Sequence, residues 1–221
     1  MKPRLVQQEH VGVKICGVRT LHDALSACDA GADALGFNFW PHSKRYLDPS
    51  ELSKWMRDMP DSVERIGVFV NAGTEEVMRL LEEGVVHAAQ FHGDETSDYY
   101  KKFSPATVCL KAFTVRDASS LDVVSGFQAS TVLLDAYCPG EYGGSGTSFE
   151  WGLGRSFVAD NPATSVVLAG GLSPGNVASA ISQVRPAAVD VASGVESAPG
   201  VKDHSMVRDF VRLAHEMNIR D

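Results

Sequence analysis

Segments with the periodicity of a β-strand alternate with segments with the periodicity of an α-helix along almost the whole chain. Short apolar runs predict strands, and runs with apolar residues three and four apart predict helices. The predicted strands are 11–16, 32–39, 65–70, 87–91, 107–113, 131–136, 165–169 and 188–192. The predicted helices are 20–30, 49–59, 74–83, 96–103, 117–124, 149–159, 174–184 and 203–217. Strict alternation implies a parallel sheet, and eight pairs in 221 residues predict an α/β fold, a single (β/α)8 or TIM barrel.

An open, doubly wound sheet is the alternative arrangement of alternating strands and helices. Such sheets usually have fewer strands and carry GxGxxG after the first one, a motif that does not follow 11–16 here. No Pro/Ser-rich linker or change of composition divides the chain, so we expect one domain over residues 1–221. Residues 1–11 are mostly polar and are expected to be a short N-terminal extension of the barrel.

Charge and hydropathy exclude several kinds of partner. The net charge is −8 and no Lys/Arg cluster is present, which argues against nucleic-acid binding. No apolar stretch is long enough to span a bilayer, and the first residues lack the core of a signal peptide, so we expect a cytoplasmic protein without membrane contact. The four cysteines are scattered without a CxxC pair, which favours free thiols over a zinc site, and we expect no metal in the active site.

The first predicted strand ends in Lys14, Ile15 and Cys16, at the end of the barrel where active sites form. Alternation places Lys14 and Cys16 on one face; if Ile15 meets the helices, both point into the barrel. A buried ammonium needs a partner, and Asp190 on the neighbouring last strand is the candidate. The cation near Cys16 could favour its thiolate, whereas the alternative is an inert core thiol.

Two further polar residues end predicted strands. Asp135 ends the sixth, where a carboxylate is either catalytic or orients a loop. Asp135 and Cys16 lie on well-separated strands, a suitable layout for an acid and a base on two sides of a small substrate. His92 follows the fourth strand and either lines the pocket or caps the strand.

Glycine-containing turns follow the last two strands, with Gly170 and Gly171 in one and Ser193 and Gly194 in the other. The loops after strands seven and eight are the usual phosphate site of such barrels, and a helix predicted to start at Pro174 would add its positive dipole end. The glycines of 143–146 indicate either a lid or more backbone donors. The pair Lys44 and Arg45 is either a solvent-exposed surface or a grip on a substrate carboxylate, for which Arg has the better geometry.

Taken together, these motifs resemble those of the phosphoribosylanthranilate isomerases of tryptophan biosynthesis. The matching segments include KICG at 14–17, SKRY at 43–46, QFHGDE at 90–95, LLDAY at 133–137, LAGGL at 168–172 and VDVASGVE at 189–196. The resemblance extends over nearly the whole chain from Val13 onward, with order and spacing kept.

The resemblance implies an Amadori rearrangement of N-(5′-phosphoribosyl)anthranilate, an aldose–ketose isomerisation that needs no cofactor. It assigns Asp135 as the general acid that opens the ring, Cys16 as the general base at C2′, and Arg45 as the group that holds the anthranilate carboxylate. It assigns the binding of the phosphate to Gly170, Gly171, Ser193 and Gly194. The partner is then a small phosphosugar. No exposed apolar face stands out in the sequence, so we expect a monomer or homodimer.

Two rival functions remain on the same fold. The histidine-pathway aminoimidazole isomerase is expected to use carboxylates at both catalytic strand ends, whereas the first strand here offers Cys16. A catalytically silent, phosphate-binding barrel is the other, and the retained Cys16, Asp135 and Arg45 argue against it.

Overall fold

The computed structural model describes residues 1–103, 107–136 and 150–217. Eight strands close into a barrel in chain order, and every neighbouring pair is parallel, with β8 returning to β1. The strands are β1 (Gly12–Cys16), β2 (Ala34–Asn38), β3 (Glu64–Phe69), β4 (Ala88–Phe91), β5 (Cys109–Val115), β6 (Thr131–Ala136), β7 (Ser165–Leu168) and β8 (Ala188–Val191). The predicted barrel is therefore confirmed, and β6 has the predicted bounds.

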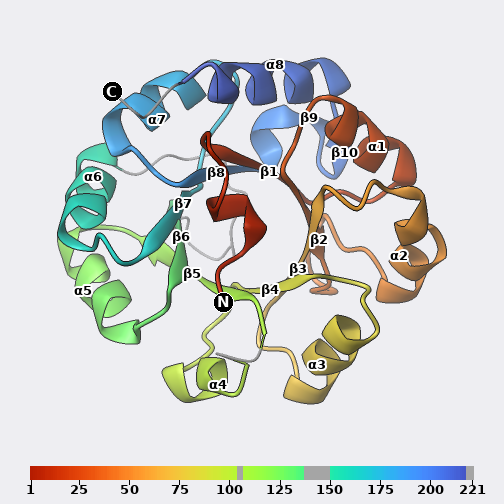
Figure 1. Cartoon of the computed structure of the whole chain (residues 1–221), viewed down its shortest axis with the longest axis horizontal. Helices are drawn as coiled ribbons and strands as arrows, with labels where there is room; N and C mark the ends of the chain where they lie inside the picture. Colours follow the sequence, from red (N-terminus) through yellow and green to blue (C-terminus); the bar gives the residue numbers. More distant parts are fainter. Residues whose placement is uncertain (104–106, 137–149, 218–221) are drawn as a thin grey trace.

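A helix follows each strand and covers the outside of the barrel (Figure 1). The helices are α1 (Leu21–Asp29), α2 (Pro49–Trp55), α3 (Thr74–Glu82), α4 (Ser97–Lys101), α5 (Ala118–Phe127), α6 (Trp151–Asp160), α7 (Val177–Val184) and α8 (His204–His215). Helix α8 shows why these segments form: its apolar residues fall on one buried face, and the Asp203 side chain caps its first turn by accepting from Ser205 N and Met206 N. Within the described ranges, no helix is long and apolar enough to cross a bilayer.

The core has two layers because strand side chains alternate between the inside and the outside of the barrel. Val13 and Ile15 of β1 pack outward against the helices in the larger apolar cluster. A smaller cluster, which includes Ile66, Leu133 and Val167, fills the barrel interior. This alternation leaves Lys14 and Cys16 on the inner face of β1, as predicted.

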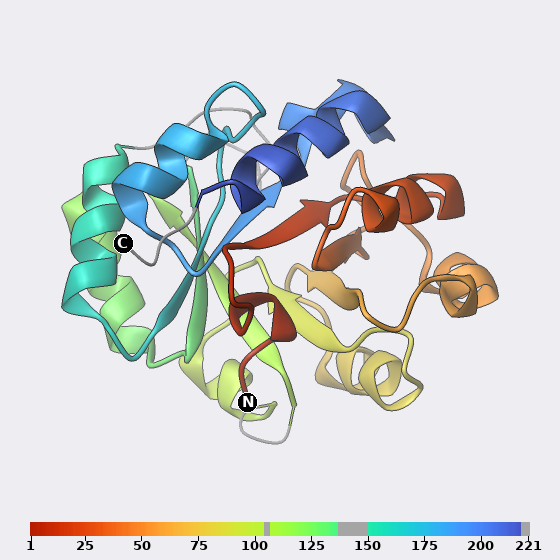
Figure 2. The same cartoon turned by 45° about the horizontal axis from the view of Figure 1, so that its top comes forward.

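The N-terminal segment is part of the core, which the sequence analysis did not anticipate. Arg4–Val6 forms a short 3-10 helix, and Leu5 is fully buried in the inner apolar cluster. Glu64, at the start of β3, accepts hydrogen bonds from the backbone amides of Arg4 (3.0 Å) and Leu5 (2.9 Å). Figures 1 and 2 both place this segment over one mouth of the barrel. The expected extension is thus a plug that closes the amino end of the strands.

Other differences concern the ends of elements. Helix α7 begins at Val177 rather than at Pro174, because Ser173–Asn176 form a turn in which Asn176 Oδ1 accepts from Ser173 N (2.8 Å). A two-stranded antiparallel hairpin, β9 (Glu196–Ala198) and β10 (Val201–Lys202), was not predicted and follows β8. The glycines of 143–146 lie outside the described residues.

Candidate active site

A pocket at the carboxyl ends of the strands brings most of the predicted site residues together. Its wall includes Cys16, Arg45, His92, Asp135, Gly170, Gly171, Asp190 and Ser193. Lys14 is fully buried beneath this wall. Gly194 directly follows the lining residue Ser193 in the chain. His92 is among the residues that line the pocket.

Lys14, Cys16 and Asp190 form a buried charged group at the base of the pocket. Lys14 Nζ donates to Asp190 Oδ1 at 2.8 Å, which confirms the predicted contact between β1 and β8. Gly36 on β2 makes room for them: a Cβ there would lie 2.8 Å from Cys16 Sγ and 2.9 Å from Lys14 Nζ. The absence of a side chain at this position allows the ammonium and the thiol to lie side by side.

The environment of Cys16 raises rather than lowers its pKa. Burial is the largest cause; the Lys14 ammonium opposes it, and the Asp190 carboxylate adds to it. Lys14 acts in the direction expected, towards the thiolate, but desolvation outweighs this one neighbouring cation and the net pKa shift is upward. Lys14 itself has a raised pKa, since Asp190 and Cys16 overcome the effect of its burial. Cys16 is consequently a thiol near neutral pH, with an ammonium beside it that favours its deprotonation.

Asp135 and His92 face the same pocket from β6 and from the end of β4. His92 Nε2 lies 3.3 Å from Asp135 Oδ2, and both side chains are largely buried. The amide nitrogen of Gln90 lies 2.8 Å from His92 Nδ1. If this amide donates, Nδ1 is the acceptor and the neutral ring carries its proton on Nε2, towards Asp135. Gln90 thereby sets the orientation of His92, and His92 that of the carboxyl group.

Arg45 forms a bidentate ion pair that the sequence analysis missed. Its Nε and one terminal nitrogen each donate to Glu196 at 2.7 Å. Lys202 Nζ also donates to Glu196 at 2.9 Å, so one carboxylate holds two cations at the pocket wall. Burial raises the pKa of Glu196, but the opposite effect of Arg45 and Lys202 is larger. The net shift of the pKa is downward. Arg45 is thus fixed in place by the hairpin that follows β8.

The turns after β7 and β8 have backbone conformations and contacts that require glycine. Gly170 and Gly171 have φ values of 82° and 64°, in the left-handed region. A Cβ on Gly194 would lie 1.8 Å from the carbonyl oxygen of Leu172, so the two turns pack directly on each other. Asn176 Nδ2 donates to Gly171 O at 2.9 Å and ties the first turn down. The predicted phosphate turns are therefore adjacent, although the nearest α-helix starts later than expected.

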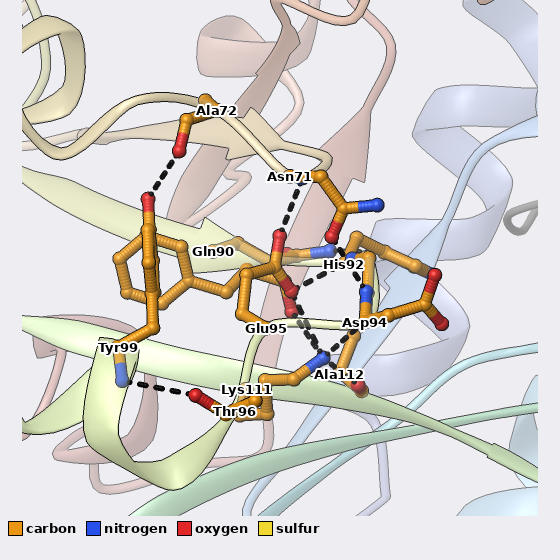
Figure 3. A network of polar contacts seen from close by, with 12 residues as sticks. Asn71, Ala72, Gln90, His92, Asp94, Glu95, Thr96, Tyr99, Lys111 and Ala112 are labelled. Atoms are coloured by element: carbon orange, nitrogen blue, oxygen red, sulfur yellow. Dashed lines mark hydrogen bonds and ion pairs between the residues drawn. The ribbon is translucent and has the colours of Figure 1, made fainter.

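A second buried lysine supports the loop that carries His92. Lys111 on β5 lies 3.2 Å from Glu95, which also accepts from the backbone amides of Asn71 (2.8 Å) and Gly93 (2.9 Å) (Figure 3). Lys111 also donates to the carbonyl oxygens of Gly93 and Ala112. A lysine inside a predicted apolar strand was the sequence feature that could have revealed this network, by the same reasoning as for Lys14.

Comparison with known proteins shows the family of this chain. The family model described as N-(5′phosphoribosyl)anthranilate (PRA) isomerase matches residues 13–213. The chain belongs to this family. A curated N-(5′-phosphoribosyl)anthranilate isomerase of Trichlorobacter lovleyi is 48% identical over 206 residues, which cover 93% of this chain and 98% of the relative.

Solved isomerase structures share the fold over their full length. Phosphoribosyl anthranilate isomerase from Thermotoga maritima has a TM-score of 0.87 and 38% identity, covering 94% of this chain and 100% of that one. A second isomerase structure, in complex with reduced 1-(o-carboxyphenylamino)-1-deoxyribulose 5-phosphate, has a TM-score of 0.83 and 36% identity over the same shares. The similarity to the isomerase family therefore extends over the barrel fold.

Proposed function

We propose that this chain isomerises N-(5′-phosphoribosyl)anthranilate to 1-(2-carboxyphenylamino)-1-deoxyribulose 5-phosphate, a step of tryptophan biosynthesis. The observation that carries the proposal is the convergence of Cys16 and Asp135 on one pocket that also contains the two glycine turns. An acid, a base and an anion-binding wall are the groups that opening and enolising a phosphosugar requires. Membership of the isomerase family supports the same substrate.

In the proposed reaction, protonated Asp135 donates a proton to the furanose ring oxygen, and the C1′–O4′ bond breaks to give a Schiff-base cation. Cys16, as thiolate, removes the proton from C2′, and the C–H electron pair forms the C1′–C2′ double bond of an enolamine while the π electrons of the C1′=N bond move onto the nitrogen. The C2′ hydroxyl then loses its proton while C1′ gains one. C1′ is reduced and C2′ is oxidised, so the reaction is an intramolecular oxidoreduction that needs no cofactor.

The remaining site residues bind and orient in this proposal. The backbone amides of Gly170, Gly171, Ser193 and Gly194 bind the phosphate, and Arg45, held by Glu196, binds the anthranilate carboxylate. Lys14, paired with Asp190, limits the rise in the Cys16 pKa. His92 orients Asp135, and solvent at the pocket returns the proton from Cys16 to Asp135 after each turnover.

The test is to add the protein to freshly made phosphoribosylanthranilate and to follow the fluorescence of the anthranilate group. We expect the signal to decay far faster than by spontaneous breakdown, and the phosphoribosyl aminoimidazole substrate of the histidine pathway to remain unconverted. The Cys16→Ser variant is the matched control for contaminating activity. Decay no faster than the spontaneous rate with the purified chain would refute the proposed activity.

The proposal extends to the setting of the enzyme. We expect residues 1–221 to act as one domain, in the cytoplasm, on a diffusible phosphosugar and without nucleic acid. We expect a monomer or a homodimer; the relatives include dimeric phosphoribosylanthranilate isomerase from Thermotoga maritima. Sedimentation equilibrium of the full chain distinguishes these two states.

A further inference from the structure

Two histidines and a carboxylate converge at the amino end of the barrel, on the side away from the pocket. His10 belongs to the segment before β1, Asp33 to the turn between α1 and β2, and His215 to the last position of α8. His10 Nε2 lies 3.1 Å from Asp33 Oδ1, and His215 Nε2 lies 3.3 Å from Asp33 Oδ2. One ligand atom from each residue lies within 4.8 Å of the others.

These separations suit a shared metal ion. Zinc bonds to imidazole nitrogen and carboxylate oxygen are about 2.0–2.2 Å long, so ligand atoms around a tetrahedral ion lie about 3.3 Å apart. The two imidazole rings meet edge to face, with centroids 4.3 Å apart and planes at 70°. This arrangement allows both Nε2 atoms to point at the same carboxylate without the rings stacking.

The carboxylate is already fixed for such a role. Asp33 Oδ2 accepts from the backbone amide of Val13 at 2.8 Å, the kind of second hydrogen bond that orients metal ligands. The His10 and His215 side chains are 39% and 29% exposed, which leaves solvent access for the remaining ligands.

We propose that His10, Asp33 and His215 form a binding site for a divalent transition metal ion of the Zn²⁺ class. Two imidazoles and one carboxylate favour such ions over Mg²⁺ and Ca²⁺, which prefer oxygen ligands alone. The site joins the N-terminal segment to the end of α8 and so fastens the segment that carries the Leu5 plug. It is independent of the catalytic pocket and of the proposed reaction.

Two of the three ligands lie outside the region that the family model matches. His10 and His215 both lie outside residues 13–213, which the family model matches, whereas Asp33 lies inside them. A comparable set of residue types serves as an internal control. His22 and His204 also pair edge to face, and His204 Nε2 lies 2.7 Å from Asp23, but no three-ligand group is found there in the described residues.

The test uses the metal-free full chain and a chromophoric chelator that competes for Zn²⁺. We expect one equivalent of Zn²⁺ to bind with a dissociation constant below about 0.1 mM. In His10→Ala and in His215→Ala the affinity should fall by about tenfold or more, since loss of a ligand costs at least as much as loss of a group that orients one. His22→Ala should bind as the natural chain does.

Two further measurements separate this site from the thiols. Co²⁺ bound to the chain should show a visible spectrum without a thiolate charge-transfer band, which excludes cysteine ligands. Zn²⁺ should raise the melting temperature of the natural chain and of His22→Ala, but not that of His10→Ala, because only a folded state that holds the ligands together gains stability. No stoichiometric binding, a thiolate band, or equal affinity in His10→Ala and the natural chain would overturn the proposal. The three groups would then only form hydrogen bonds with one another.

Discussion

The two ends of the barrel differ in what their residues do: one end forms the pocket, and the other closes the core. At the carboxyl end, Cys16, Asp135 and Arg45 surround a pocket; Asp135 contacts His92, and Arg45 is paired with the buried Glu196. At the amino end, Leu5 packs into the inner apolar cluster. Glu64 accepts hydrogen bonds from two backbone amides of the N-terminal segment. The groups assigned to the reaction lie where strands lead into loops, whereas Leu5 and Glu64, which close the core, lie where strands begin. The comparison predicts that activity and stability respond to different substitutions.

Asp135→Asn at the carboxyl end should have the largest effect on turnover. The change keeps the shape beside His92 but removes the transferable proton, so we expect kcat to fall by about 10²- to 10⁴-fold. The midpoint of urea unfolding should stay close to that of the natural chain. Steady-state kinetics and urea denaturation, run on the same preparation, measure both. A kcat within a fewfold of normal would remove Asp135 from the role of acid.

Leu5→Ala at the amino end should give the opposite pattern. A fully buried leucine truncated to alanine leaves a cavity inside the barrel, and the free energy of unfolding should fall by about 2–5 kcal/mol. We expect kcat to stay within a fewfold of normal under conditions where the protein is folded. Val123→Ala is the matched control, because Val123 is 65% exposed and should tolerate the change. A large loss of kcat without loss of stability would show that the two ends are not separate.

Lys14→Met tests how a buried charge at the carboxyl end acts on chemistry. Burial already raises the pKa of Cys16, and without the ammonium it should rise further. At a pH below that pKa, the thiolate fraction falls tenfold for each unit by which the pKa rises, so kcat/KM near neutral pH should be lower in the variant by about tenfold for each unit of further shift. The limb of the pH profile of kcat/KM that reports the ionisation of Cys16 should move to higher pH.

Lys111→Met is the matched control for Lys14→Met. Lys111 is also buried and also paired with a carboxylate, but its partners belong to the loop after β4 rather than to Cys16. We expect this variant to lose stability while its pH profile keeps the natural position. An unshifted profile in Lys14→Met, or a shifted one in Lys111→Met, would contradict the assigned influence of Lys14.

Arg45→Ala should produce the smallest of these effects, and mainly on substrate binding. Loss of a charge-assisted contact to the carboxylate should raise KM by about tenfold or more, with a lesser change in kcat. Unfolding should be little affected, because Glu196 retains Lys202 as a partner. Initial rates over a range of substrate concentrations separate the two constants, and unchanged values of both would remove Arg45 from the site.

Much of the fold followed from local patterns. Eight alternations of periodicity predicted the barrel, and strand alternation placed Lys14 and Cys16 inside it and paired Lys14 with Asp190. The glycine turns after β7 and β8 were identified from their positions alone. These predictions succeeded because side-chain direction in a strand repeats every two residues and active ends of barrels are fixed by topology.

Tertiary structure decided what local patterns do not encode. Glu196 on Arg45, Leu5 within the barrel, and His10 with His215 on Asp33 join residues distant in sequence, and closure of the barrel brings them together. Tertiary structure also decided the direction of the Cys16 pKa shift. That direction depends on whether the rise caused by burial exceeds the lowering caused by the Lys14 ammonium. The sequence by itself therefore determined the barrel and the location of its chemistry. Only the folded chain determined the charge state of Cys16, the partner that holds Arg45, and the closure of the amino end, because desolvation and long-range contacts arise only on packing.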